Sequence, residues 1–320
     1  MERLIDIHHL KKYYWTGGGF FKKRDAVKAV DDVSFYIKKE EILGLVGESG
    51  CGKTTCGKVI LRIQEPTEGK IYYNTHDITN LPKKQMHEYR KKMMIIYQDP
   101  FGSLDPRMTI GATIAEPIEV HNIIPPEEKE EKENKIIEIM EKVGLTPDQI
   151  NRYPHEFSGG QRQRIGIARA LATNPEFIVA DEPVSALDVS IQAQIINLLK
   201  DLQKEFGLTL LFITHDLSVI KHISDRIAVM YAGKLVESAS KKELFKNPLH
   251  PYTKALLSAI PIPDPKLKRK FIALKGEVPS LLNPPPGCRF HPRCPDCKKP
   301  CTIIDPHLEE VAKDHFVACF

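Results

Sequence analysis

Short apolar runs recur along the first three quarters of the chain and predict the strands of a buried sheet. They are rich in β-branched residues and end in glycine-rich or polar segments. The runs cover residues 33–37, 42–46, 93–97, 177–180, 208–214 and 226–231. Helical spacing of apolar positions separates several of these runs, as in 191–206. We therefore expect an α/β fold with a mainly parallel sheet that helices cover on both faces.

Two changes in this pattern divide the chain into regions. The strand signal stops after residue 98, where charged helical sequence replaces it, and the segment 127–143 places its apolar residues on one face. We expect 99–161 to form an inserted helical subdomain within a core made of 1–98 and 162–236. Prolines become frequent after about residue 237, so 237–320 is expected to be a C-terminal accessory region.

Composition narrows the classes of function. The 320 residues include 46 basic and 42 acidic side chains, and the net charge of +4 is too small to indicate a nucleic-acid-binding surface. No apolar run approaches the roughly 20 residues of a membrane-spanning helix, and the N-terminal segment lacks the apolar core of a signal peptide. We expect a cytosolic protein, for which any role at a membrane depends on partner subunits.

A glycine-rich segment follows the strand predicted at 42–46. Its sequence, Gly-Glu-Ser-Gly-Cys-Gly-Lys-Thr at 47–54, has the spacing of a P-loop, in which backbone N–H groups curl around phosphates at the start of a helix. Lys53 is expected to neutralise the β- and γ-phosphates of ATP, and Thr54 to place its hydroxyl on Mg²⁺. The predicted nucleotide-binding residues of this segment are Gly47, Ser49, Gly50, Gly52, Lys53, Thr54 and Thr55.

Two carboxylates end the apolar strand predicted at 177–180. Asp181 and Glu182 follow it directly, at the sheet edge where a P-loop also emerges in such a fold. Asp181 is expected to hold Mg²⁺ through water, and Glu182 to orient and polarise the water that attacks the γ-phosphate. The pair predicts a site of nucleotide hydrolysis.

The segment Ser-Gly-Gly-Gln at 158–161 precedes a helical stretch at 162–172, so its N–H groups can face an anion at a helix start. Together with the P-loop and the acidic strand end, it makes the sequence similar to the ABC ATPases over residues 4–237. The resemblance implies their nucleotide-binding fold, a RecA-like P-loop core with an antiparallel β subdomain and a helical subdomain. It also implies an ATP-binding segment that acts on the opposite subunit of a head-to-tail dimer, formed by Ser158, Gly159, Gly160 and Gln161.

Further positions match motifs of this family and take their roles from the resemblance. Gln98 corresponds to the Q-loop glutamine, which contacts Mg²⁺, and His215 to the switch histidine, which contacts the γ-phosphate. Asp188 closes a Ser-Ala-Leu-Asp segment that resembles the D-loop at the dimer seam. Tyr14 corresponds to the aromatic residue that stacks on adenine, although the aromatic residues at 13 and 15 leave this assignment open.

The region after the core resembles one particular group of ABC ATPases. His-Pro-Tyr-Thr at 250–253 and the helix-like segment 254–259 are similar to the C-terminal extension of oligopeptide and dipeptide importer ATPases, and 28–35 and 98–106 are similar to their F-type subunit. This implies ATP-driven peptide import by a peripheral subunit at the cytoplasmic face of the cell membrane. The implied partners are a D-type ATPase subunit or a second copy of this chain, two transmembrane permease subunits and, indirectly, an extracytoplasmic peptide-binding protein.

A soluble ABC ATPase that acts on nucleic acid or ribosomes is the alternative from another class of function. Such proteins usually carry two cassettes in one chain or a long coiled coil within the cassette. This sequence has one cassette with a moderate helical insertion. Transport is therefore favoured, with no nucleic acid among the expected partners.

Five of the seven cysteines lie between residues 288 and 319. In a reducing compartment such a group favours a metal site over disulfides, and four thiolates suffice for zinc or an iron–sulfur cluster. The resemblance to peptide-importer ATPases implies a four-iron four-sulfur cluster on Cys288, Cys294, Cys301 and Cys319. Cys297 is additional, and its Cys-x-x-Cys spacing with Cys294 keeps zinc open. Because these cysteines lie outside every nucleotide motif, we expect a structural role on which ATP binding does not depend, with redox sensing as the alternative.

Overall fold

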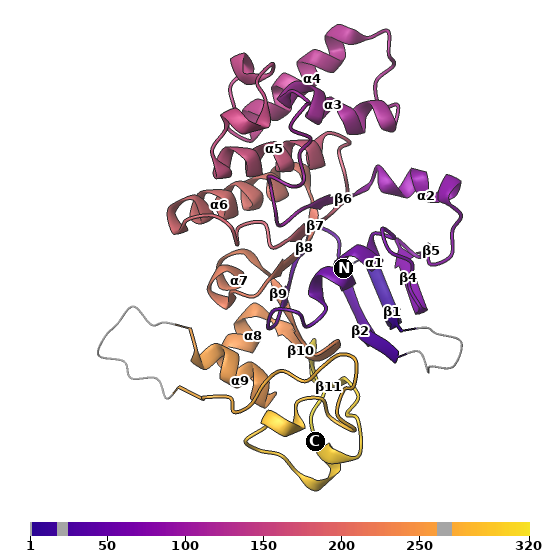
Figure 1. Cartoon of the computed structure of the whole chain (residues 1–320), viewed down its shortest axis with the longest axis vertical. Coiled ribbons are helices and arrows are strands. Elements are labelled where there is room, and N and C mark those ends of the chain that lie inside the picture. The colour runs from indigo at the N-terminus through magenta and orange to yellow at the C-terminus, as the bar shows by residue number, and fades with distance from the viewer. Residues whose placement is uncertain (1, 18–24, 261–270) are drawn as a thin grey trace. The chain divides into compact units, whose positions relative to one another are not determined.

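The computed structural model describes residues 2–17, 25–260 and 271–320 (Figure 1). Its internal contacts divide the chain into two compact units. The first unit contains Lys38–Glu41 and Asn80–Ile213. The second contains the described parts of Arg3–Ile37, Ile42–Thr79 and Thr214–Phe320. Within the described ranges, no helix combines the length and the apolar character needed to cross a bilayer.

Three parallel strands form the sheet of the first unit. β7 (Phe177–Asp181) lies between β6 (Met93–Ile96) and β8 (Thr209–Thr214). Every residue of β7 and β8 is buried, as their nearly continuous apolar sequence leads one to expect. The parallel pairing predicted from the apolar runs is confirmed for these strands.

Helices pack around this sheet. α5 (Gly159–Leu171) is central, because it contacts β6 and three other helices, namely α3 (Ile110–Val120), α4 (Lys129–Lys142) and α6 (Val189–Phe206). The other helical elements are α2 (Lys83–Arg90) and the short η1 (Pro147–Gln149) and η2 (Pro154–Glu156). The bounds 99–161 of a helical subdomain stay a prediction, because the contacts of this segment join it with β6, β7 and β8 in one unit.

The second unit contains two groups of strands. The first group is ordered β2 (Asp25–Lys38), β1 (Arg3–Thr16), β4 (Glu68–Tyr73) and β5 (His76–Asp77), and β4 is antiparallel to both β1 and β5. The second group begins with a parallel pair, β3 (Ile42–Val46) and β9 (Arg226–Tyr231). Three antiparallel strands continue it, β10 (Lys234–Ser240), β12 (His315–Val317) and β11 (Glu309–Ala312).

Short helices complete the second unit. The α-helices are α1 (Lys53–Ile60), α7 (Leu217–Ile223), α8 (Lys241–Lys246) and α9 (Pro251–Ser258). The remaining turns are η3 (His291–Arg293) and η4 (Lys299–Thr302), both in the cysteine-rich segment. α9 begins three residues earlier than the helix-like segment 254–259 predicts.

One buried carboxylate ties the end of the chain to the second unit. Glu237 on β10 is fully buried and lies 2.8 Å from His315 Nε2 on β12. It also accepts hydrogen bonds from the backbone N–H groups of Leu249 at 2.8 Å and His250 at 2.9 Å. A buried carboxylate is stable only when such partners replace water. These contacts therefore hold β12 and the start of α9 against β10.

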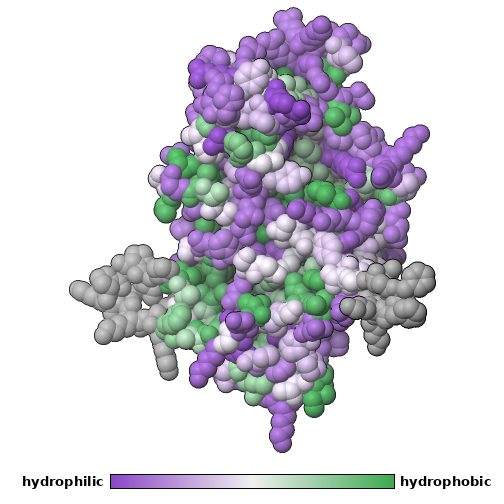
Figure 2. All heavy atoms as spheres, in the orientation of Figure 1, coloured by the Kyte–Doolittle hydropathy of each residue, from purple (hydrophilic) through white to green (hydrophobic). Residues whose placement is uncertain are grey.

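The visible surface is mostly hydrophilic, and hydrophobic side chains lie on it in small groups (Figure 2). Among the residues that the structure describes, the most exposed large apolar side chains are Val189, Ile303 and Phe271. Scattered apolar side chains of this kind are common on globular proteins.

Candidate functional site

The glycine-rich segment lies in the second unit, between β3 and α1. Gly52 has a φ of 105°, and a Cβ built on it would lie 2.0 Å from the carbonyl oxygen of Ala29, so only glycine fits there. Lys53 is 4% exposed, and its Nζ donates to the carbonyl oxygens of Gly47 at 2.8 Å and Glu48 at 3.0 Å. The ammonium group is thus held by the loop itself, next to a helix N-terminus that favours an anion.

The other predicted phosphate-binding residues belong to the same loop and helix. Ser49 and Gly50 are exposed on the loop. Thr54 and Thr55 are partly buried in the first turn of α1. The strand, loop and helix that the P-loop spacing requires are therefore all present in this order.

The predicted carboxylates lie in the first unit, at the end of β7. Asp181 is the last residue of the strand, Glu182 follows it, and both side chains are buried. Glu182 has a φ of 45°, in the left-handed region, and its N–H donates to the carbonyl oxygen of Ile213 at 2.9 Å. Gln98 Nε2, just beyond β6, donates to Glu182 Oε2 at 3.2 Å. The structure thus brings two of the predicted site residues, Gln98 and Glu182, into contact.

The Ser-Gly-Gly-Gln segment begins α5 with a capping box. Ser158 Oγ accepts from the Gln161 N–H at 3.3 Å, and Gln161 Oε1 accepts from the Ser158 N–H at 3.0 Å. A Cβ on Gly160 would lie 2.6 Å from Ile191 Cγ2 of α6, so α5 and α6 approach closely there. Ser158 itself is exposed, which leaves this helix start accessible from outside the chain.

Asp188 also sits at a helix start. Its carboxylate accepts hydrogen bonds from Ser190 Oγ at 2.7 Å and from the Ile191 N–H at 3.1 Å, and so caps α6. These two bonds, the one from the Ser190 hydroxyl above all, lower the pKa of Asp188 below its usual value. The side chain is exposed and stays ionised at neutral pH.

The remaining nucleotide candidates lie in the second unit. His215 is exposed directly after β8. On β1, the Tyr14 hydroxyl hydrogen-bonds Gln64, the Tyr13 hydroxyl hydrogen-bonds Asp31, and Trp15 is exposed.

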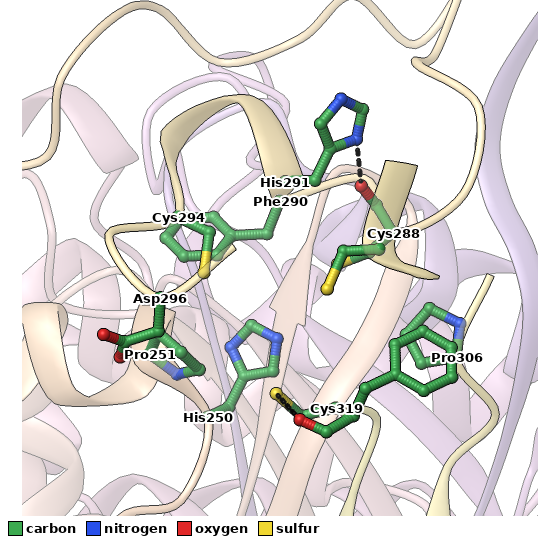
Figure 3. Close-up of a pocket in the computed structure, with 11 residues that line it drawn as sticks. His250, Pro251, Cys288, Phe290, His291, Cys294, Asp296, Pro306 and Cys319 are labelled. Carbon is green, nitrogen blue, oxygen red and sulfur yellow. Dashed lines mark hydrogen bonds between the residues drawn. The ribbon is translucent and has the colours of Figure 1, made fainter. Parts of the chain in front are cut away.

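Four of the five C-terminal cysteines line one small cavity in the second unit. They are Cys288, Cys294, Cys301 and Cys319, joined by His250 and Phe290, whereas Cys297 does not line it. Figure 3 shows the sulfur atoms of Cys288, Cys294 and Cys319 turned toward the same space, beside His250. Across the ranges that the structure describes, no group of three or more His, Cys, Asp or Glu side chains is placed to hold a single metal ion.

Burial controls the protonation of the groups around this cavity. It raises the pKa of the Cys288 thiol to about 11 and raises those of Cys294 and Cys319 as well. It lowers the pKa of His250 to about 4, so this ring is neutral near pH 7. His250 Nδ1 accordingly accepts the Tyr252 N–H at 3.1 Å and caps α9.

Sequence reasoning missed one contact of the P-loop. Glu48 forms an ion pair with Arg293, which comes from the segment between Cys288 and Cys294. The two residues are 245 positions apart, so no local pattern could have indicated the pair.

Comparison with known proteins identifies the family. Residues 30–185 match the family described as ABC transporter, and residues 236–301 match the oligopeptide/dipeptide transporter C-terminal region. The oligopeptide transport ATP-binding protein AppF of Bacillus subtilis is 54% identical, over 99% of this chain and 97% of its own length. The dipeptide transport ATP-binding protein DppF of Haemophilus influenzae is 48% identical, over 99% and 96%.

Solved structures agree with this result. The dimeric structure of MJ0796, a bacterial ABC transporter cassette, is 29% identical, with a TM-score of 0.65, and covers 74% of this chain and 98% of its own. The CbiO1 structure from Clostridium perfringens has a TM-score of 0.66 over 77% of this chain and 92% of its own, and at 24% identity it supports the fold alone. This chain belongs to the ABC transporter family, among the ATP-binding subunits of the oligopeptide/dipeptide type.

Proposed function

We propose that this chain binds and hydrolyses ATP to drive the import of oligopeptides or dipeptides through a membrane permease. The observation that carries the proposal is the order of two matched regions in one chain, an ABC transporter region at 30–185 and a peptide-transporter C-terminal region at 236–301. Relatives named for oligopeptide and dipeptide transport match nearly the whole chain. The working place of such a subunit is the cytoplasmic face of the membrane, against two transmembrane permease subunits.

The loop at 47–54 is the proposed binding site for the phosphates of ATP. Its N–H groups and the N-terminus of α1 favour the anionic phosphates, and Lys53 adds a full positive charge that the loop carbonyls already hold in place. Mg²⁺ would neutralise phosphate charge when bound, held by Thr54, Gln98 and Asp181. Tyr14 is the proposed partner of adenine.

Glu182 is the proposed acceptor for the proton of the attacking water. It is a buried carboxylate at a strand end, and the amide of Gln98 contacts one of its oxygens. An acceptor fixed in this way can orient a water molecule without entering the metal shell. His215 would stabilise the charge that develops on the γ-phosphate.

The exposed start of α5 supports action across a dimer. Ser158 and Gln161 satisfy each other through the capping box, while the helix N-terminus faces outward. We assign the 158–161 segment to ATP held by the opposite subunit and Asp188 to the same dimer interface. The opposite subunit would be a D-type ATPase or a second copy of this chain, and an extracytoplasmic binding protein would deliver the peptide.

Reconstitution tests the proposed function. The chain is co-purified with tagged permease subunits, placed in proteoliposomes with the binding protein, and supplied with ATP and labelled peptides of two to six residues. Peptide-stimulated ATP hydrolysis with peptide uptake is expected. ATP hydrolysis without uptake of any peptide would show that the substrate class is wrong. Co-sedimentation with ribosomes or nucleic acid instead of permease would support the alternative function, against which the peptide-transporter C-terminal match speaks.

We also propose that Cys288, Cys294, Cys301 and Cys319 hold a four-iron four-sulfur cluster. The proposal is supported by the position of these four cysteines, which all line one cavity, whereas the additional Cys297 does not. A single tetrahedral zinc, with Zn–S bonds of about 2.3 Å, would draw its four sulfur atoms close together. A four-iron cluster is a larger body that holds its thiolates farther apart, and four cysteines from separate turns around one cavity suit such a body.

A further inference from the structure

A two-pronged ion pair joins the cysteine-rich segment to the P-loop. Arg293 ends the η3 turn and directly precedes Cys294. Its Nη1 lies 2.8 Å from Glu48 Oε2, and its Nη2 lies 3.2 Å from Glu48 Oε1. The Arg293 side chain is 8% exposed and that of Glu48 is 27% exposed, so water screens this pair only in part. Each donor meets a different carboxylate oxygen, which is the geometry in which such a pair is strongest and most directional.

Glu48 is held from two further directions. Its N–H donates to the Tyr252 hydroxyl of α9 at 2.9 Å, and its carbonyl oxygen accepts from Lys53 Nζ at 3.0 Å. Tyr252 in turn packs against Phe290, with ring centroids 5.4 Å apart. One of the two carbonyls that position Lys53 therefore belongs to Glu48, the residue whose side chain the cysteine-rich segment holds.

A second arginine of the same segment acts nearby. Arg289, directly after Cys288, donates to the carbonyl oxygen of Ala232 and to the carboxylate of Asp31. The neighbouring Gly233 N–H donates to the carbonyl oxygen of Cys51, inside the P-loop, at 2.8 Å. The cysteine-rich segment thus contacts the P-loop through Arg293 and the residues beside the P-loop through Arg289.

Charge gives the Glu48 contact a consequence for nucleotide binding. Glu48 places a carboxylate within the loop that is proposed to bind the phosphates of ATP. The carboxylate and the phosphates are both negatively charged, so they repel each other. Arg293 offsets that carboxylate.

We propose that Arg293 is a positioning residue for ATP: it neutralises Glu48 and fixes the P-loop, and so the cysteine-rich segment sets the affinity of the site for Mg-ATP. The inference rests on the proposed function, since it assumes that the P-loop binds ATP. It replaces the sequence-based expectation that ATP binding does not depend on the cysteines. Because Arg293 precedes Cys294, displacement of this cysteine is also expected to weaken ATP binding.

A double-mutant cycle tests the proposal. The variants are R293Q, E48Q and the double variant R293Q/E48Q, since glutamine keeps most of the side-chain volume. For each, the Kd of Mg-ATP is measured by competition with a fluorescent ATP analogue at low and high salt, together with KM, kcat and thermal unfolding. The matched control is K298A, since Lys298 Nζ donates to the carbonyl oxygen of Phe320 at 2.6 Å and ties the same segment to the chain end.

R293Q is expected to raise the Kd and KM for ATP about tenfold and to leave kcat at saturating ATP within about twofold. High salt should reduce this defect, and the double variant should regain most of the affinity because the repelling carboxylate is gone. K298A should bind ATP like the wild type. C294S should also raise the Kd of Mg-ATP, as R293Q does.

Several outcomes would overturn the inference. A folded R293Q with wild-type Kd, or Kd values that show no coupling between the two positions, would reduce the pair to an anchor for the tail. If R293Q does not fold, R293M replaces it, because methionine keeps much of the side-chain volume and removes the charge, and a folded R293M with wild-type Kd at low salt would then overturn the inference. A wild-type protein that binds no Mg-ATP would instead contradict the proposed function itself.

Discussion

Glu182 adopts a backbone conformation that its surroundings must enforce. A left-handed φ such as its 45° costs a residue other than glycine about 1–3 kcal/mol. The N–H bond to Ile213 O and the side-chain contact with Gln98 hold the residue in this state. Strain of this kind at a buried carboxylate agrees with the catalytic role proposed for Glu182.

Glu182→Gln tests that role. The amide keeps the size of the side chain but cannot accept a proton, so we expect ATP binding to persist and hydrolysis to fall at least about 100-fold. Phosphate release measures the rate, and size-exclusion chromatography with ATP detects the nucleotide-bound dimer that should accumulate. Glu176→Gln is the matched control, because Glu176 makes an exposed ion pair with Lys92 just before β7. Wild-type turnover in Glu182→Gln would contradict the assignment.

Lys53→Ala removes the charge proposed to lie over the phosphates. Lost charge-assisted hydrogen bonds of this kind correspond to roughly a tenfold to 100-fold weaker binding of Mg-ATP. Equilibrium titration with a fluorescent ATP analogue measures the Kd. Lys58→Ala, one turn further along α1, serves as the control and should bind normally. Equal affinities of the two variants would show that Lys53 has no part in binding.

At the scale of elements, local signals could be predicted and non-local ones could not. The P-loop and its flanking β3 and α1 follow from adjacent residues, as does the capping box of α5. β1 was not predicted, because a register shift between His8 and Lys11 breaks its alternation of apolar and polar residues. β10 was not predicted for similar reasons, because it has a register shift beside Glu237 and buries that charged residue.

The start of α5 provides a prediction about geometry between subunits. Ser158→Arg places a bulky cation at the exposed helix start and removes a cap worth about 1 kcal/mol, too little to unfold the protein. We expect it to impair hydrolysis at the ATP site of the opposite subunit. Two mixed dimers measure this. One carries Ser158→Arg and Glu182→Gln on different subunits, and the other carries both changes on the same subunit. Asn151→Arg, at an exposed turn before the same helix, is the control. Damage confined to the variant's own site would contradict action in trans.

At the scale of the whole chain, each unit carries its own share of the proposed nucleotide residues. The first unit contains Gln98, Asp181 and Glu182, and the second contains Lys53, Thr54 and His215. Sequence could identify these positions because each belongs to a short motif that follows an apolar strand, where such motifs are informative. It could not relate the cysteine-rich segment to the P-loop, since the Glu48 and Arg293 contact depends on how distant parts of the chain fold together.

Metal content provides the last prediction. Protein purified without oxygen should contain about four iron and four sulfide per chain and show broad visible absorbance. Cys288→Ser and Cys319→Ser should each lose the iron, because each removes one of the four thiolates that line the cavity, whereas Cys297→Ser should keep it. Burial raises the pKa of the Cys288 thiol to about 11, so protons compete with metal for this ligand, and loading of the metal-free protein should improve as the pH rises from 7 to about 9. Elemental analysis and acid-labile sulfide assays of all four proteins decide the matter. Stoichiometric zinc without sulfide, or iron lost from Cys297→Ser but retained in Cys288→Ser, would overturn the assignment of both metal and ligands.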